Sequence, residues 1–148
     1  MVTAAFDSSA LVRFYLRNEP DSQVVQAFVL DASNSVVASR IFPIEFVSAL
    51  ARQVREGVLS ATDATRLQSD LRADRDLLYT LVDVTDAELG AAELVVQRQP
   101  VRALDALHIG MALTVEALLP ERIQFWTADR RQATAARAEG LDVVLVGS

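Results

Sequence analysis

Short apolar runs rich in β-forming residues alternate with stretches of helical periodicity along the whole sequence. The runs predict strands at residues 2–6, 35–38, 81–84, 123–127 and 143–146. Because helical stretches separate these strands, the connections must cross over the sheet, and such connections join parallel strands. The alternation therefore predicts an α/β protein, a three-layer α/β/α sandwich whose mostly parallel sheet has about five short strands.

Residues that commonly begin a helix mark several of the helical stretches. Asp21 and Asp86 each precede such a stretch, Pro43 falls in a first turn, and the segment from Ser60 to Asp63 resembles a capping box. We expect helices at about residues 8–15, 21–28, 43–56, 61–78, 86–98, 103–119 and 130–139.

Length and composition limit the possible chemistry. The 148 residues suit one domain, residues 1–148. Folding at this length hides roughly 70% of the unfolded chain's surface, so a core can form without disulfides or a structural metal. The sequence has no cysteine and one histidine, His108, which excludes the cysteine and histidine sets that hold zinc. Any bound metal must therefore have oxygen ligands.

Neither the first residues nor the longest apolar segment points to a membrane. The first residues, MVTAAFD, lack the basic region and long apolar stretch of a signal peptide. The longest apolar segment, residues 103–119, contains polar residues that favour a buried helix over a membrane span. We therefore expect a cytoplasmic protein with no membrane association.

Four acidic residues occupy informative positions. Asp7 directly follows the first predicted strand, and Asp129 comes two residues after the fourth. Glu45 and Asp105 interrupt apolar runs in the first turns of predicted helices, which suggests partial burial. Ligands of parallel sheets bind beyond the carboxyl ends of the strands, where these side chains would lie.

Each acid alone has a structural explanation. Asp7 and Asp129 would make ordinary helix N-caps, and the helix dipole favours Glu45 and Asp105 in a first turn. If all of them point to the same edge of the sheet, however, their mutual repulsion raises their pKa values and destabilises the fold. No lysine is present to neutralise them. A divalent cation resolves the conflict, and hard oxygen ligands select Mg²⁺, with Mn²⁺ as an alternative.

Several segments in order along the chain form a recognisable pattern: FDSSALV (6–12), IEFVSAL (44–50), ALDALHI (103–109) and WTADRR (126–131), followed by AARAEGL (135–141). Together they resemble the PIN-domain family, and within it the VapC-type toxins of bacterial toxin–antitoxin pairs. The resemblance runs from the first predicted strand to the last. It implies a PIN-like α/β fold over essentially the whole chain.

The resemblance also implies an activity. PIN-type toxins are Mg²⁺-dependent endoribonucleases, and the matching acidic pocket would consist of Asp7, Glu45, Asp105 and Asp129 as catalytic and metal-binding residues. Ser9 matches a small hydroxyl position of the family. Thr127 matches another. The implied partners are structured RNA, commonly tRNA or ribosomal RNA, a small antitoxin that occupies the cleft, and a second copy of the chain in a homodimer.

The physical mechanism can be stated without the resemblance. One ion, or a pair, would lower the pKa of a bound water, align it with a phosphodiester and stabilise the departing oxygen. Either Glu45 or Asp129 could instead orient that water as a base.

Other polar residues have two interpretations. His108 lies three positions after Asp105, and a core or supporting histidine is favoured over a catalytic base or a Ser–His–Asp triad.

The net charge of −6 argues against nucleic-acid binding by overall charge, but a local basic groove is compatible with it. The arginines that could hold RNA phosphates, or be solvated surface charges, are Arg13, Arg17, Arg130 and Arg131.

Two other classes of function compete. An aspartyl-phosphate phosphoryl-transfer protein would use Asp7 as nucleophile, but such sites normally employ a lysine, and the chain has none. A non-catalytic scaffold or binding module with a PIN-like fold would use the acids only as helix caps. The retention of all four acids disfavours this interpretation.

Overall fold

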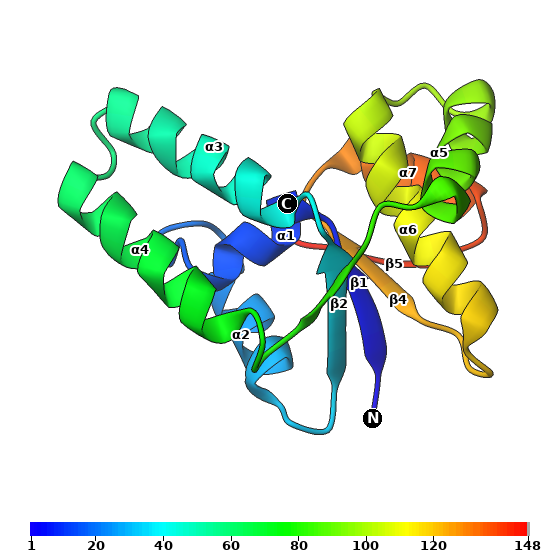
Figure 1. Cartoon of the computed structure of the whole chain (residues 1–148), viewed down its shortest axis with the longest axis horizontal. Helices are drawn as coiled ribbons and strands as arrows, with labels where there is room; N and C mark the ends of the chain where they lie inside the picture. Colours follow the sequence, from blue (N-terminus) through cyan, green and yellow to red (C-terminus); the bar gives the residue numbers. More distant parts are fainter. Residues whose placement is uncertain (148) are drawn as a thin grey trace.

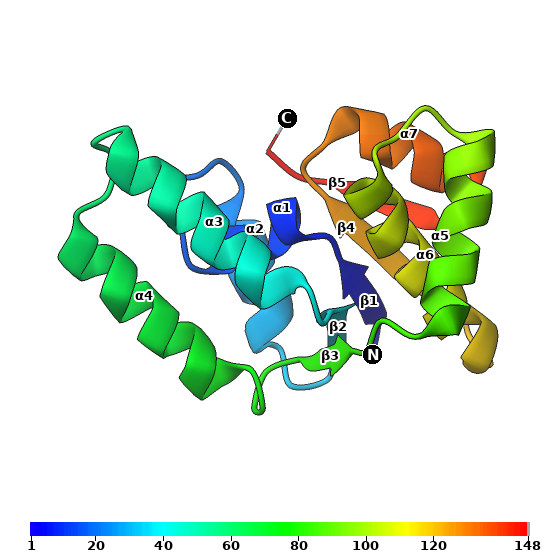
Figure 2. The same ribbon diagram turned by 45° about the horizontal axis from the view of Figure 1, so that its top comes forward.

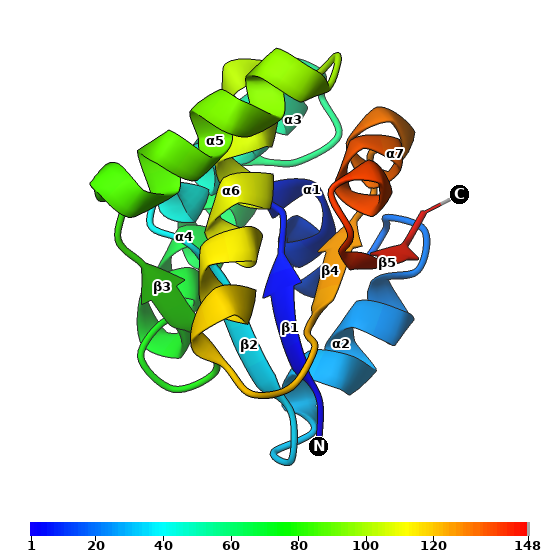
Figure 3. The ribbon, with the colours of Figure 1, turned by 90° about the vertical axis from the view of Figure 1, so that its right-hand side faces the viewer.

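The expected strands form one sheet in the computed structural model, which describes residues 1–147 (Figure 1). The strand order is β3-β2-β1-β4-β5, and each neighbouring pair is parallel (Figure 3). The strands are β1 (Thr3–Phe6), β2 (Ser35–Ser39), β3 (Thr80–Val82), β4 (Gln124–Thr127) and β5 (Asp142–Leu145). All carboxyl ends therefore meet at one edge of the sheet.

Helices cover both faces of the sheet. They are α1 (Ser8–Leu11) with a following 3-10 turn (Val12–Phe14), α2 (Ser22–Leu30), α3 (Phe42–Arg55), α4 (Ala61–Asp74), α5 (Asp86–Arg98), α6 (Ala103–Leu118) and α7 (Arg130–Ala138). Figure 2 shows α1 to α4 on one side of the sheet and α5 to α7 on the other. The predicted three-layer α/β/α sandwich is confirmed. Among residues 1–147, no helix is both long and apolar enough to cross a membrane.

The alternating side chains of β1 divide the core into two clusters. Phe6 packs into the cluster beneath α1 to α4, where its ring stacks on Trp126 of β4 with 4.9 Å between the ring centroids. Ala5 points to the opposite cluster, beneath α5 to α7. Because helices cover both faces of the central strand β1, all of its residues are buried and it does not alternate between polar and apolar side chains.

Two helices are shorter than the sequence predicts. The first helical stretch is a single α-helical turn, α1, and a 3-10 turn. Helix α4 ends at Asp74, four residues before the predicted end. The amides of Leu77 and Leu78 both donate to the Asp74 carbonyl, at 2.9 and 2.8 Å, and so close a turn that leads into β3. The prediction of a helix to residue 78 was wrong because this turn must return the chain to the sheet.

The predicted caps are only partly correct. Asp21 has a left-handed backbone conformation, with φ of 62°, and its carboxylate accepts a hydrogen bond from the Gly147 amide instead of capping α2. Ser60 does cap α4. A reciprocal capping box forms instead at α5, where Glu88 is long enough to reach back to the Thr85 amide. Thr85, and not Asp86, is therefore the cap of α5.

The close approach of α5 and α6 gives a test of the packing. A Cβ atom added at Gly110 of α6 would lie 2.8 Å from the backbone nitrogen of Ala92 in α5, so Gly110→Ala must push the helices apart. We expect it to lower the free energy of unfolding by about 1–3 kcal/mol in urea titrations.

Gly90 is the matched control, since it lies in α5 and a Cβ there meets nothing within 4 Å. Gly90→Ala should raise stability by about 0.5–1 kcal/mol through helix propensity alone. Similar changes in both variants would contradict the packing described for Gly110.

Candidate active site

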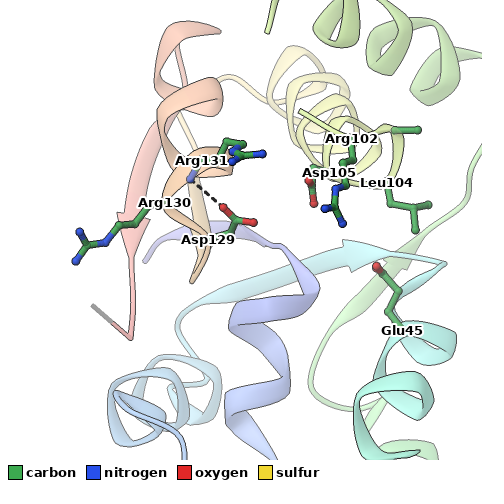
Figure 4. A pocket seen from close by; sticks show the side chains of 8 residues that line it. Glu45, Arg102, Leu104, Asp105, Asp129, Arg130 and Arg131 are labelled. Carbon is green, nitrogen blue, oxygen red and sulfur yellow. Dashed lines mark hydrogen bonds between the residues drawn. The ribbon is translucent and has the colours of Figure 1, made fainter. Parts of the chain in front are cut away.

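A cavity of about 850 Å³ opens at the carboxyl ends of the strands (Figure 4). Three of the four predicted acids line it, and each comes from a different helix: Glu45 from α3, Asp105 from α6 and Asp129 from the start of α7. The remaining lining residues are Arg102, Ala103, Leu104, Arg130 and Arg131. Segments far apart in the sequence thus deliver carboxylates to one site.

Asp7 lies deeper, at the end of β1. Its side chain is buried, and Oδ2 accepts hydrogen bonds from the backbone amide and the hydroxyl of Ser9. Thr127 places its Oγ1 3.0 Å from the same oxygen. The other oxygen, Oδ1, lies 3.7 Å from Nε2 of His108. Asp7 therefore caps α1, and the hydroxyls of Ser9 and Thr127 both contact Oδ2 of its carboxylate.

The two carboxylate oxygens of Asp129 have different surroundings: one caps helix α7, and the other makes no hydrogen bond within residues 1–147. The amides of Arg131 and Gln132 both donate to Oδ1, at 2.8 and 3.1 Å, so the carboxylate caps α7. Within residues 1–147, Oδ2 has no hydrogen-bond partner. The cap interpretation and the site interpretation are therefore compatible, because one carboxylate has two oxygens.

Asp105 carries charge that its surroundings do not neutralise. Burial raises the pKa of its carboxyl group, and the negative charges of Asp7 and Asp129 raise it further. A hydrogen bond from the Arg102 backbone and the charge of His108 act in the opposite direction but are weaker. This is the signature expected when like charges converge.

Glu45, by contrast, is compensated. Its Oε1 accepts a hydrogen bond from Ser8 Oγ at 2.7 Å and lies 2.6 Å from His108 Nε2. Burial acts to raise the pKa of Glu45, but the hydrogen bond and charge of His108, with the Ser8 hydroxyl, lower it overall. The pKa of His108 is raised, because Glu45 and the charge of Asp7 outweigh its burial.

The geometry explains the role of His108. The ring is 1% exposed, and Nδ1 has no hydrogen-bond partner among residues 1–147. Ser8 and His108 Nε2 both donate to the same Glu45 oxygen, so the ring does not accept the serine proton as a triad would require. The predicted burial of His108 is confirmed, and its contact with Glu45 is compatible with the predicted supporting role.

The predicted RNA-binding arginines separate into two groups. Arg130 and Arg131 line the cavity, although Arg130 extends away from Asp129 in Figure 4. Arg13 instead connects α1 with the loop before α2, because its guanidinium group donates hydrogen bonds to the carbonyls of Ser9 and Pro20. Arg17 lines a different hollow, between the 3-10 turn and α4. Neither Arg13 nor Arg17 reaches the acids.

Arg102 is a cavity residue that the sequence did not single out. It stands at the N-cap position of α6, three residues before Asp105, and that spacing was the available signal. Among the ion pairs of residues 1–147, none joins Arg102, Arg130 or Arg131 to an acid of the cavity. The cavity is therefore lined both by acidic residues and by arginines that form no ion pair with them among residues 1–147.

The donor set fits a hard divalent cation in its chemistry. Within residues 1–147, no three acidic or histidine side chains already stand close enough together to hold a metal ion. The fit rests on the open oxygen of Asp129 and on the raised pKa of Asp105. Oxygen ligands with excess negative charge suit Mg²⁺ or Mn²⁺.

Comparison with known proteins identifies the family. Residues 4–139 match the model of the PIN domain, so the chain belongs to the PIN-domain family. The resemblance seen in the sequence is confirmed. A search among curated proteins returned no match.

Solved structures share this fold at low sequence identity. VapBC2 from Rickettsia felis, bound to a promoter DNA fragment, is 14% identical with a TM-score of 0.66, covering 98% of this chain and 99% of that one. FitAcB from Neisseria gonorrhoeae is 16% identical with a TM-score of 0.67, covering 95% of both chains. Mycobacterium tuberculosis VapC20, a sarcin–ricin loop cleaving toxin, is 15% identical with a TM-score of 0.66, covering 93% of this chain and 95% of that one.

The raised pKa of Asp105 predicts a pH-dependent effect on stability. A carboxyl group whose pKa rises on folding supports the fold while protonated, and this support is lost as the pH rises through the raised pKa. Asp105→Asn removes the charge. In EDTA at pH 7, we expect the variant to be more stable than the wild type by up to about 1 kcal/mol after solvent screening.

The difference should shrink as the pH falls toward about 3.9, the ordinary aspartate value. Thermal denaturation of both proteins across this range provides the measurement. A variant that is less stable than the wild type at pH 7 would show that Asp105 is already compensated.

Proposed function

We propose that this protein is a Mg²⁺-dependent endoribonuclease, the toxin of a VapBC-type toxin–antitoxin pair, and that it cleaves structured RNA with a metal-activated water. One observation carries the proposal: Glu45, Asp105 and Asp129 come from separate helices to line one cavity. Asp105 keeps a raised pKa there. A scaffold that uses acids only as helix caps accounts for Asp7 and Asp129 but leaves the cost of Asp105 unexplained.

The side chains divide into a cation-binding group and a water-orienting residue. Asp7, Asp105 and Asp129 would hold the Mg²⁺ ion, with Mn²⁺ as a substitute. A bound ion supplies Lewis-acid chemistry and lowers the pKa of its water. Ser9 and Thr127 fix the Asp7 carboxylate in place through the hydrogen bonds described above.

Glu45 is suited to orient the attacking water. Its Oε1 is occupied by Ser8 and His108, while Oε2 has no hydrogen bond within residues 1–147 and is free to accept one. The lowered pKa keeps Glu45 ionised near neutral pH, so Oε2 can accept a hydrogen bond from the water and orient it. His108 then stabilises the position of the carboxylate.

The arginines of the cavity would contact the substrate. Arg102, Arg130 and Arg131 line the same cavity as the acids. Their positive charge offsets the repulsion between an acidic site and a phosphate backbone. RNA as the substrate class is supported by the likeness to VapC20, described as a sarcin–ricin loop cleaving toxin. Ribosomal RNA and tRNA are therefore the first substrates to test.

The proposed partners are a small cognate antitoxin and a second copy of the chain. The likeness to the VapBC2 complex supports the antitoxin. Ile44 and Leu104 stand beside the cavity with 71% and 53% of their surface exposed, an apolar rim that suits a protein partner. The homodimer rests on the family resemblance.

Asp7→Asn tests the activity. The amide keeps the size of the side chain and an oxygen that can cap α1, but it removes the charge that would hold the cation. We expect RNA cleavage to fall at least roughly 100-fold while the protein stays folded. The measurement is sequencing of RNA 5′ ends after expression of the wild type and the variant, with cleavage of purified RNA in Mg²⁺.

Asp76→Asn is the matched control, because Asp76 is exposed in the turn between α4 and β3. It should cleave RNA like the wild type. Full cleavage by Asp7→Asn would refute the assignment of the site. Absence of cleavage in the wild type as well, across tRNA and ribosomal RNA, would favour the non-catalytic scaffold.

A further inference from the structure

Gln132 is a buried polar side chain that the proposed reaction does not use. It lies in the first turn of α7 and is 1% exposed. Its Nε2 donates to the backbone carbonyl of Asp105 at 3.1 Å, and its Oε1 accepts from the Thr127 hydroxyl at 2.8 Å. One amide thus connects the element that carries Asp105 with the strand end beside Asp7.

The orientation of this amide follows from its partners. A carbonyl oxygen can only accept a hydrogen bond, so the Asp105 carbonyl requires the NH₂ group of Gln132 on its side. Rotating the amide by half a turn would place two carbonyl oxygens against each other. The Gln132 oxygen therefore faces Thr127.

The Thr127 hydroxyl has one proton and three oxygens within hydrogen-bond distance. Gln132 Oε1 lies 2.8 Å away, Asp7 Oδ2 3.0 Å and Ser9 Oγ 3.3 Å. Ser9 Oγ is the most distant and already donates to Asp7 and accepts the Ala128 amide, so Gln132 and Asp7 are the main acceptors. A lone pair of the Thr127 hydroxyl accepts the Asp129 amide at 3.1 Å, which leaves its proton available for donation. Thr127 is 0% exposed, so water is not available as a further acceptor.

The charge of Asp7 decides which acceptor is preferred. A carboxylate is a stronger acceptor than a neutral amide, so the proton favours Asp7 while its charge is uncompensated. A cation held by Asp7 would offset that charge and weaken the carboxylate as a hydrogen-bond acceptor. The Thr127 hydroxyl could then donate its hydrogen bond to Gln132 instead. Without Gln132 the buried hydroxyl would lack a partner, which costs free energy of folding.

We infer that Gln132 is a positioning residue that accepts the Thr127 hydrogen bond and so relieves Asp7 Oδ2 of one of its three hydrogen bonds when a divalent cation binds. This inference rests on the proposed function, because it concerns the same acidic site. It differs from a purely structural role of the buried amide in one respect. The effect of Gln132 on cation binding should depend on the Thr127 hydroxyl.

A double-mutant cycle measures that dependence. Mn²⁺ binding would be followed by isothermal titration calorimetry in the wild type, Gln132→Met, Thr127→Val and the double variant. Methionine keeps the length and approximate volume of glutamine but has no amide. With Thr127 present, we expect Gln132→Met to weaken Mn²⁺ binding about fivefold, as for one lost hydrogen bond. In the Thr127→Val background, the same change should have little effect.

Gln53→Met is the matched control, because Gln53 is a partly buried glutamine of α3 whose amide donates to Glu19 rather than to the cavity. It should bind Mn²⁺ like the wild type. The loss of the Asp105 carbonyl contact is common to both backgrounds and cancels in the cycle.

Each outcome decides the inference. Equal weakening by Gln132→Met in both backgrounds, or no weakening in either, overturns it and leaves the proposed function intact. A wild type that does not bind Mn²⁺ overturns the metal-dependent function and this inference together. If Gln132→Met does not fold, Gln132→Leu takes its place in the same cycle, and the same two outcomes decide.

Discussion

The convergence of carboxylates at one edge of a parallel sheet is the constraint on which the rest of this protein depends. Parallel strands bring their carboxyl ends to the same edge, and β1 and β4 are neighbours there. Asp7 and Asp129 follow these strands and cap the next helices, so the fold itself needs them at that edge. Helices α3 and α6 begin close by and add Glu45 and Asp105.

The four carboxylates differ in how far neighbouring hydrogen-bond donors and positive charges stabilise their negative charge. His108 and Ser8 hold Glu45, and helix amides hold one oxygen of Asp129. Asp105 remains the acid whose pKa is raised by its neighbours. Loss of this charge would favour the fold, and the cation proposed above would relieve the same repulsion.

Much of the architecture could be predicted from the sequence, because it follows from local periodicity. The alternation of strand and helix patterns predicted the sheet, and the positions of Asp7 and Asp129 after strands predicted their edge of the sheet. Helix ends were less predictable. The turn at residues 75–78 and the role of Asp21 depend on distant partners, namely β3 and Gly147. Arg102 and Gln132 were not predicted for the same reason, since their importance comes from tertiary contacts and not from a motif.

The position of a bound ion tests the central claim most directly. Crystals grown with Mn²⁺ and measured near the manganese absorption edge would locate the ion by its anomalous signal. We predict a peak within coordination distance, about 2.0–2.3 Å, of carboxylate oxygens from Asp7, Asp105 and Asp129. A well-ordered cavity with no peak at saturating Mn²⁺, or a peak only at other residues, would contradict the claim.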